Sequence, residues 1–236
     1  MLEVTHLRAG YGAATVLEDV SISVDEGKFV VLTGPNGHGK TTLLRVLSGL
    51  LPAGEGEVTF LGEPLNGKSA AAIVGRGLVH IPQGDLLFVD LTVEQNLFMG
   101  AYLSAAWRSR RDRIKRVYEL FPRLEERRGQ QARTLSGGER RMLGIGRGLM
   151  SNARLLMVDE PALGLAPVLV QEVYATLDRI ARSEATVLLV EETLANARDI
   201  ADYVYLMDTG RIVHEGTMAE FGADVLSSTY LGNRGS

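Results

Sequence analysis

The sequence of 236 residues contains no cysteine, which excludes disulfide bonds, thiolate metal ligands and cysteine nucleophiles. Long apolar runs are also missing, and none reaches the roughly 18 residues that a membrane-spanning helix needs. The opening stretch MLEVTHLRAG lacks the charged and then apolar pattern of a signal peptide. We therefore expect a protein that stays in the cytoplasm.

Positive charge is scarce, because 29 acidic residues outnumber 25 basic ones and the formal net charge is −4. This balance argues against a general affinity for nucleic acid. One basic run, RSRRDRIKR at 108–116, is a local exception. On a helix such a run is usually a solvated face, so we expect no nucleic acid as a partner.

Short apolar runs alternate with longer helical patterns, as is typical of an α/β fold with a parallel sheet. Their near-continuous apolar character fits strands that are covered on both faces. The runs are FVVLT (29–33), LVHIP (78–82), LLMVD (155–159) and TVLLVE (186–191).

Other segments depart from this pattern. Alternation of apolar and polar residues predicts half-exposed antiparallel strands at 16–24 and 56–62. The block 92–130 reads as helical, opens at a Thr92 cap and has a second helical run that ends near Pro122. In the tail, YVYLMDTGRIVHEG predicts two strands joined by a turn.

The strongest chemical signal is GPNGHGKT at 34–41, between the strand FVVLT and a helical run. This is the pattern of a phosphate-binding loop in its strand-to-helix context. Glycines let backbone N–H groups converge on phosphate oxygens, and the helix N-terminus adds a favourable dipole. Lys40 would reach the β- and γ-phosphates and Thr41 would bind Mg²⁺. We expect His38 to be a solvent-edge side chain rather than a catalytic one.

Two further segments fit the same chemistry. LLMVDE at 155–160 is an apolar strand that ends in Asp159 and Glu160, which suits one carboxylate for magnesium's water shell and one that activates water. In TLSGGERRMLGIGRGLM, Ser136 starts an amphipathic helix and offers a second anion site. One ATP has no obvious use for two such sites in one chain, so the second is expected to serve a neighbouring chain's nucleotide.

GPNGHGKTT, the glutamine in HIPQG, LSGGE and LLMVDEP resemble, in this order, the nucleotide-binding subunits of ABC transporters over about residues 2–231. The resemblance implies a P-loop NTPase of the ABC ATPase type, with a mostly parallel core sheet, an N-terminal antiparallel β subdomain and an inserted helical subdomain. It implies one domain over 1–236: an α/β core at about 1–91 and 151–236, and a helical part at about 92–150.

Finer features resemble the shorter ATPase subunit of branched-chain amino acid importers: VHIPQGDLLFVDLTVEQNL, RVYELFPRLEERR, DEPALGLAP and TYLG. This resemblance implies an ATPase that uses ATP and Mg²⁺ and powers uptake. Its partners would be a second ATPase subunit, the same or different, two permeases and, indirectly, an extracytoplasmic solute-binding protein. It would sit on the inner face of the membrane. A urea or short-chain amide importer, a soluble non-transport ABC protein and a poorly hydrolysing regulatory subunit are the alternatives.

The resemblance also implies roles for residues. Tyr11 would stack on adenine unless it is a half-buried core residue, Gln83 would contact Mg²⁺ and the attacking water, and Glu160 would be the general base. Asp159 and Thr41 complete the metal site. The ATP-binding loop residues are Gly34, Pro35, Asn36, Gly37, His38, Gly39, Lys40, Thr41 and Thr42. The residues that would contact ATP of the opposing subunit are Ser136, Gly137, Gly138 and Glu139. Leu97, Phe98 and Tyr102 would either receive a permease helix or form core.

Two positions depart from the family pattern. Ala166 stands where many ABC ATPases carry an aspartate, and Glu192 in LLVEET stands where a histidine or glutamine senses the γ-phosphate. An ionised glutamate cannot donate a hydrogen bond to phosphate. It could be protonated, turned away to a backbone donor or a cation, or tolerated because a paired subunit is competent, and we expect the second.

Overall fold

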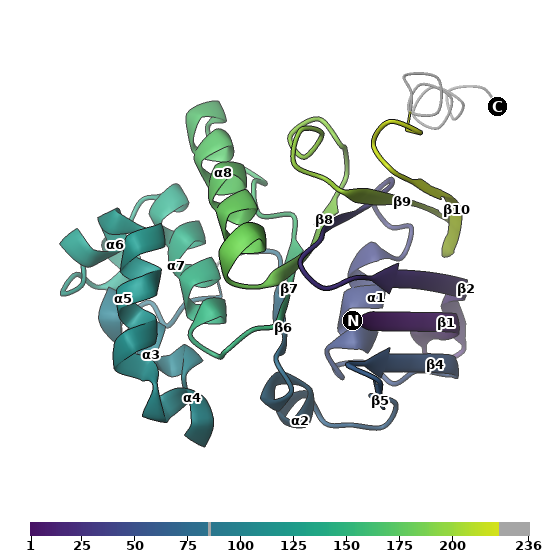
Figure 1. The fold of residues 1–236 in the computed structure, drawn as a ribbon, viewed down its shortest axis with the longest axis horizontal. Coiled ribbons are helices and arrows are strands. Elements are labelled where there is room, and N and C mark those ends of the chain that lie inside the picture. Colours follow the sequence, from purple (N-terminus) through teal and green to yellow (C-terminus); the bar gives the residue numbers. More distant parts are fainter. Residues whose placement is uncertain (85, 222–236) are drawn as a thin grey trace.

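The computed structural model describes residues 1–84 and 86–221, so the TYLG segment at 229–232 lies outside the described residues. One sheet runs through the molecule in the order β5-β4-β1-β2-β10-β9-β3-β8-β7-β6 (Figure 1). Its strands are β1 Leu2–Tyr11, β2 Ala14–Val24, β3 Phe29–Thr33, β4 Glu55–Phe60, β5 Glu63–Pro64, β6 Leu78–Ile81, β7 Leu155–Asp159, β8 Thr186–Glu191, β9 Tyr203–Asp208 and β10 Arg211–Gly216.

The strands β9, β3, β8, β7 and β6 are parallel neighbours, which confirms the predicted mostly parallel core. Every residue of β3 and β7 is buried. Pro82 lies outside β6, because proline has no N–H to donate to a ladder. No clear alternation in the sequence predicts β1. Register shifts after Val4 and Leu7, together with the positive φ of His6, break its alternation.

The antiparallel strands β5, β4, β1 and β2 continue the core sheet at one residue pair, Arg211 with Asp19. Helices cover both faces of this sheet. Leu43 and Leu44 of α1 pack with Val30 and Leu32, whereas α7 packs its apolar face on the side of Val31. Because successive strand residues point to opposite faces, α1 and α7 lie on opposite sides of the sheet (Figure 1).

The helices are α1 Lys40–Leu47, α2 Ala70–Gly75, α3 Val93–Gly100, α4 Ser104–Arg108, α5 Arg110–Leu120, α6 Pro122–Glu126, α7 Gly137–Leu149 and α8 Pro167–Ser183, with a 3₁₀ turn at Ala132–Thr134. Thr92 caps α3 through a capping box with Gln95, and Pro122 starts α6. No helix within the described part of the chain is long and apolar enough to cross a membrane. The division into core and helical subdomain stays a prediction.

Candidate functional site

The carboxyl ends of three adjacent core strands meet at one edge of the sheet. Thr33, the last residue of β3, pairs with Glu191 of β8, and Asp159 of β7 pairs with Val190. The loop 34–39, the Asp159–Glu160 pair and the Glu191–Glu192 pair therefore emerge side by side. This register brings together the three segments that the sequence analysis singled out separately.

The loop 34–39 closes around the head of Lys40. Gly34, Gly37 and Gly39 all have positive φ, and a Cβ on Gly34 would lie 2.0 Å from the Met207 carbonyl oxygen. Lys40 Nζ donates to the carbonyl oxygens of Gly34 at 2.6 Å and Pro35 at 3.0 Å. No side chain in the described residues caps the start of α1 at Gly39, so its N–H groups are open to an anion.

Lys40 is only 4% exposed. Burial lowers the pKa of its ammonium, and the surrounding carboxylates of Glu160, Glu192, Asp159 and Glu191 oppose that shift. The site thus joins one cation to several anions in a partly desolvated space. An excess of carboxylates in such a space favours a bound cation, which a metal ion that accompanies a phosphate would supply.

Thr41 and Asp159, the residues predicted to hold Mg²⁺, lie within hydrogen-bond distance of each other. Thr41 Oγ1 donates to Asp159 Oδ2 at 3.0 Å. Within the described residues, the buried Asp159 Oδ1 has no hydrogen-bond partner, and burial raises the pKa of this carboxyl. A hydroxyl beside a carboxylate with an unsatisfied oxygen is an oxygen donor set that suits Mg²⁺.

Glu160 is held beside Gln83. Gln83 Nε2 donates to Glu160 Oε2 at 2.8 Å, and the Glu160 backbone, at φ 44, donates to Val190 O at 2.9 Å. Burial raises the pKa of the Glu160 carboxyl, and Lys40 partly offsets that shift. A carboxylate with a raised pKa suits proton abstraction near neutral pH. The roles predicted for Gln83 at a metal ion and Glu160 as base stay predictions.

Tyr11 lies at the tip of the β1–β2 hairpin and is 44% exposed, outside the clusters of buried core residues, and its role at adenine stays a prediction. Arg45 Nη1 donates to its hydroxyl oxygen at 3.0 Å, and a side-chain hydrogen bond with Thr42 is the main reason that the pKa of this hydroxyl is lowered. The Tyr11 hydroxyl is thus held by side chains of α1.

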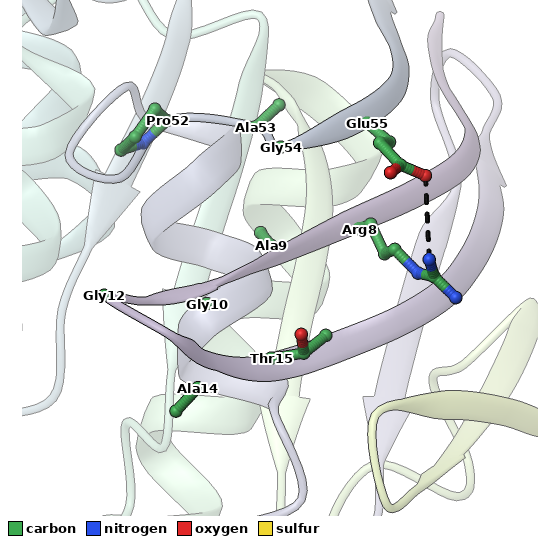
Figure 2. A pocket seen from close by; sticks show the side chains of 10 residues that line it. All are labelled: Arg8, Ala9, Gly10, Gly12, Ala14, Thr15, Pro52, Ala53, Gly54 and Glu55. Carbon is green, nitrogen blue, oxygen red and sulfur yellow. Dashed lines mark ion pairs between the residues drawn. The ribbon is translucent and has the colours of Figure 1, made fainter.

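A separate hollow of about 370 Å³ adjoins the same hairpin. Figure 2 shows that its wall is mostly glycine, alanine and proline, with Arg8 and Glu55 together at one end. These two side chains approach to 3.8 Å. Their mutual pairing leaves little net charge for phosphates, in contrast to the loop around Lys40.

Ser136 and Glu139 form a capping box at the start of α7. Ser136 N donates to Glu139 Oε2 at 2.9 Å, and Glu139 N donates to Ser136 Oγ at 3.4 Å. Arg127 Nε also lies 2.7 Å from Glu139 Oε1. This start lies across the sheet from α1. Gly137 and Gly138 form the first turn, and a Cβ on Gly138 would come within 2.8 Å of Leu169.

His38 is 24% exposed, in keeping with the expected solvent-edge position, and its Nδ1 lies 2.6 Å from Asp208 Oδ1. The β9–β10 turn reaches back to the loop through Gly210 N, which donates to His38 O. The expectation that Glu192 turns away from the phosphate loop needs correction. Glu192 Oε2 accepts a hydrogen bond from Asn36 Nδ2, a loop residue, at 3.1 Å.

Some contacts have no signal in the sequence. The Tyr174 hydroxyl of α8 donates to Glu191 Oε1, and burial raises the pKa of the Glu191 carboxyl to about 7. Arg147 of α7 donates to Leu86 O. Ala166, at the N-cap of α8, provides no side-chain cap among the described residues, because its side chain is apolar. The hydrogen bonds of Tyr174 with Glu191 and of Arg147 with Leu86 join residues that are far apart in the sequence and whose types alone indicate surface or core.

A family model described as "ABC transporter" matches residues 17–163. The chain belongs to the ABC transporter family. It is therefore an ATPase of that family, and the predicted fold is confirmed. Across 98% of its length this ABC ATPase is 40% identical to the whole of the high-affinity branched-chain amino acid transport ATP-binding protein BraG of Pseudomonas aeruginosa.

Relatives named for other transported molecules also match. The Nod factor export ATP-binding protein I of Cupriavidus pinatubonensis is 35% identical over 96% of this ABC ATPase and 70% of its own length. Among solved structures, the ADP conformation of an ATP-binding cassette of an ABC transporter aligns with a TM-score of 0.86 and 26% identity over 99% of both chains. Family and fold are thus settled, whereas the transported solute differs among relatives.

Proposed function

We propose that this ABC ATPase powers an importer of branched-chain amino acids. The observation that carries the proposal is the full-length similarity to a branched-chain amino acid transport ATP-binding protein, on a chain whose loop at Lys40, Thr41–Asp159 pair and Glu160–Gln83 pair are all assembled. The working unit would be a dimer with a second ATPase subunit, attached to two permeases on the inner face of the membrane. An extracytoplasmic binding protein would deliver the solute.

The residues of the site divide the chemistry among them. The loop 34–39 and Lys40 bind the phosphates, and Tyr11 stacks on the base. Thr41 and Asp159 would hold Mg²⁺, which would supply positive charge against the phosphates. Glu160 accepts a proton from the attacking water, and Gln83 orients the Glu160 carboxylate and that water.

The start of α7 supplies the contact between subunits. Ser136 and the N–H groups of Gly137 and Gly138 face the γ-phosphate held by the partner, and Glu139 positions Ser136. ATP then favours the closed dimer, and hydrolysis removes the phosphate that joins the two chains. Transport follows from the difference in affinity of the closed dimer for ATP and ADP.

A groove of about 660 Å³ offers a surface for a permease segment. Apolar side chains that line it are exposed, among them Leu86 at 66% and Tyr102 at 56%. Leu97, by contrast, is fully buried and is core, and Phe98 is partly buried against the core. Large exposed apolar side chains around a groove are typical of a protein interaction site. The expectation of a permease surface is therefore carried by Tyr102 and its neighbours rather than by Leu97.

The test is purification of the chain from detergent-solubilised membranes of its native cells. We expect two hydrophobic permeases and a longer ATPase to co-purify, and reconstituted vesicles to take up radiolabelled leucine when ATP is supplied inside. Uptake of urea or short amides in place of leucine would support the alternative importer class. Outward transport would match the export relative, and recovery of the chain alone or with nucleic acid would contradict the transporter role.

A further inference from the structure

The carboxylate of Glu192 contacts the phosphate-binding loop of this chain. Glu192 follows the last residue of β8, which pairs with Thr33 at the end of β3. The Thr33 hydroxyl donates to the Glu192 carbonyl oxygen at 3.2 Å, and Asn36 Nδ2 donates to Glu192 Oε2 at 3.1 Å. Both the backbone and the side chain of Glu192 are thus attached to the segment that must receive phosphate.

The charge of Glu192 acts on both ends of the reaction site. It helps to raise the pKa of the Lys40 ammonium against the larger lowering effect of burial. It also adds to the raised pKa of the Glu160 carboxyl, where burial is again the largest cause. Its field therefore reaches the space between Lys40 and Glu160, where the last phosphate of a triphosphate would be held.

Nucleoside triphosphate and diphosphate differ at this place. The γ-phosphate brings additional negative charge into the neighbourhood of Lys40, whereas a diphosphate leaves that space to water. Glu192 is exposed, so solvent screens part of its repulsion, but the site around the buried Lys40 is partly desolvated, and there like charges repel more strongly than in bulk water. A fixed carboxylate here therefore raises the free energy of the triphosphate complex and has little effect on the diphosphate complex.

We propose that Glu192, held on the loop by Asn36, determines nucleotide specificity by weakening ATP binding relative to ADP binding. The inference rests on the proposed nucleotide site and assigns to it a chain-specific bias. In the isolated chain, without its partner subunits, entry of the γ-phosphate displaces the Glu192 carboxylate from Asn36. A partner subunit or permease that pulls residue 192 away would then favour ATP loading.

The purified full chain allows a direct test through dissociation constants for MgATP and MgADP, measured by displacement of a fluorescent nucleotide. In Glu192→Gln, which keeps the size and an acceptor for Asn36 but removes the charge, we expect MgATP to bind about tenfold more tightly. MgADP should change less than about twofold. Raising the salt from about 0.05 to about 0.5 M should shrink the difference between the two proteins, since screening weakens exposed charge repulsion.

Two further variants isolate the cause. Glu3→Gln removes one negative charge from the exposed side of β1 and should change neither constant. Asn36→Ala releases the Glu192 side chain and should lower the ATP penalty only in part. Equal tightening for both nucleotides, no change, or weaker ATP binding in Glu192→Gln would overturn the inference while leaving the ATP site intact. A wild-type chain that binds neither nucleotide would instead overturn the proposed function.

Discussion

The molecule has two helix starts that could bind phosphate, and they are prepared in opposite ways. The start of α1 at Gly39 has no side-chain cap and no acidic residue in its first turn. The start of α7 is capped by Ser136 and by the Glu139 carboxylate. Both begin with backbone N–H groups that have no partner within the helix, but at α7 a capping box engages Ser136 N and Glu139 N, whereas no side chain of the described residues caps α1.

In the isolated chain, the two helix starts therefore differ in which phosphate they can receive. Around α1, the buried Lys40 ammonium already compensates for an incoming anion. At α7, an anion of the chain itself occupies the helix start, and Arg127 pairs with it. A phosphate from a partner must therefore compete with Glu139, which makes the second start conditional on a second chain.

Removal of the Lys40 ammonium should abolish phosphate binding at the start of α1. In Lys40→Ala we expect ATP turnover to fall by about 100- to 1000-fold, as on loss of a preorganised charge at a reacting phosphate. Steady-state phosphate release and nucleotide binding measure this. Lys115→Ala, on the exposed face of α5, should retain full activity. Unchanged ATP affinity in Lys40→Ala would show that α1 does not receive the phosphates.

A mutation at the start of α7 should lower ATP turnover and leave ATP binding by the monomer intact. Ser136→Ala removes a donor to the partner's phosphate, so turnover should drop about 10- to 100-fold, while a monomer's affinity for ATP stays the same. Ser69→Ala is a matched control, because Ser69 also caps a helix, α2, by accepting from Ala72 N. Loss of ATP affinity in the Ser136→Ala monomer would mean that both helix starts bind the same nucleotide.

A subtler change separates capping from charge. Glutamine at the third helical position can still form a capping box, so Glu139→Gln should keep the helix and lose the repulsion of an incoming phosphate. We expect ATP-dependent dimerisation to strengthen about threefold and stability to fall by about 0.5 kcal/mol through the lost Arg127 pair. Analytical ultracentrifugation and urea unfolding measure these effects. Glu126→Gln, which removes another carboxylate 3.3 Å from Arg127, should leave dimerisation unchanged.

The smallest expected effect is on acid stability. Burial raises the pKa of the Glu139 carboxyl, but the hydrogen bonds from Ser136 and the charge of Arg127 outweigh it, so the pKa is lowered from its ordinary 4.5. Because the folded pKa is the lower one, the stabilisation is complete above about 4.5 and is lost as the pH falls through the folded value. Wild type should therefore lose slightly more unfolding free energy than Glu139→Gln between pH 6 and pH 3.5. An equal loss would show that the cap has no charge component.

The sequence predicted this contrast only in part. Strand ends rich in Asp and Glu, the glycine spacing and the serine before two glycines are local signals, and each lies where it was expected. The capping box is local too, since Ser136 and Glu139 are three residues apart. Its consequence for a partner's phosphate depends on the position of α7 across the sheet, which no short pattern contains.

Long-range pairings account for what was missed. The attachment of Asn36 to Glu192 spans 156 residues, and that of His38 to Asp208 spans 170. Such pairs depend on the register of β3 with β8 and β9, which the apolar patterns of three similar strands do not specify. The strand β1 was missed for the opposite reason, because its bulges disturb a pattern that is otherwise local.

The junction between β2 and β10 has a mechanical meaning. Among the described strand residues, only Arg211 and Asp19 pair there, whereas the β1–β2 and β9–β10 ladders on either side pair at several positions despite their register shifts. Such a seam is expected to open in hydrogen exchange before either half unfolds. Tyr11 belongs to one half and Lys40 follows a strand of the other. A nucleotide held between Tyr11 and Lys40 would stabilise the β2–β10 junction. Hydrogen exchange of the amides near Asp19 should then be slower when nucleotide is bound.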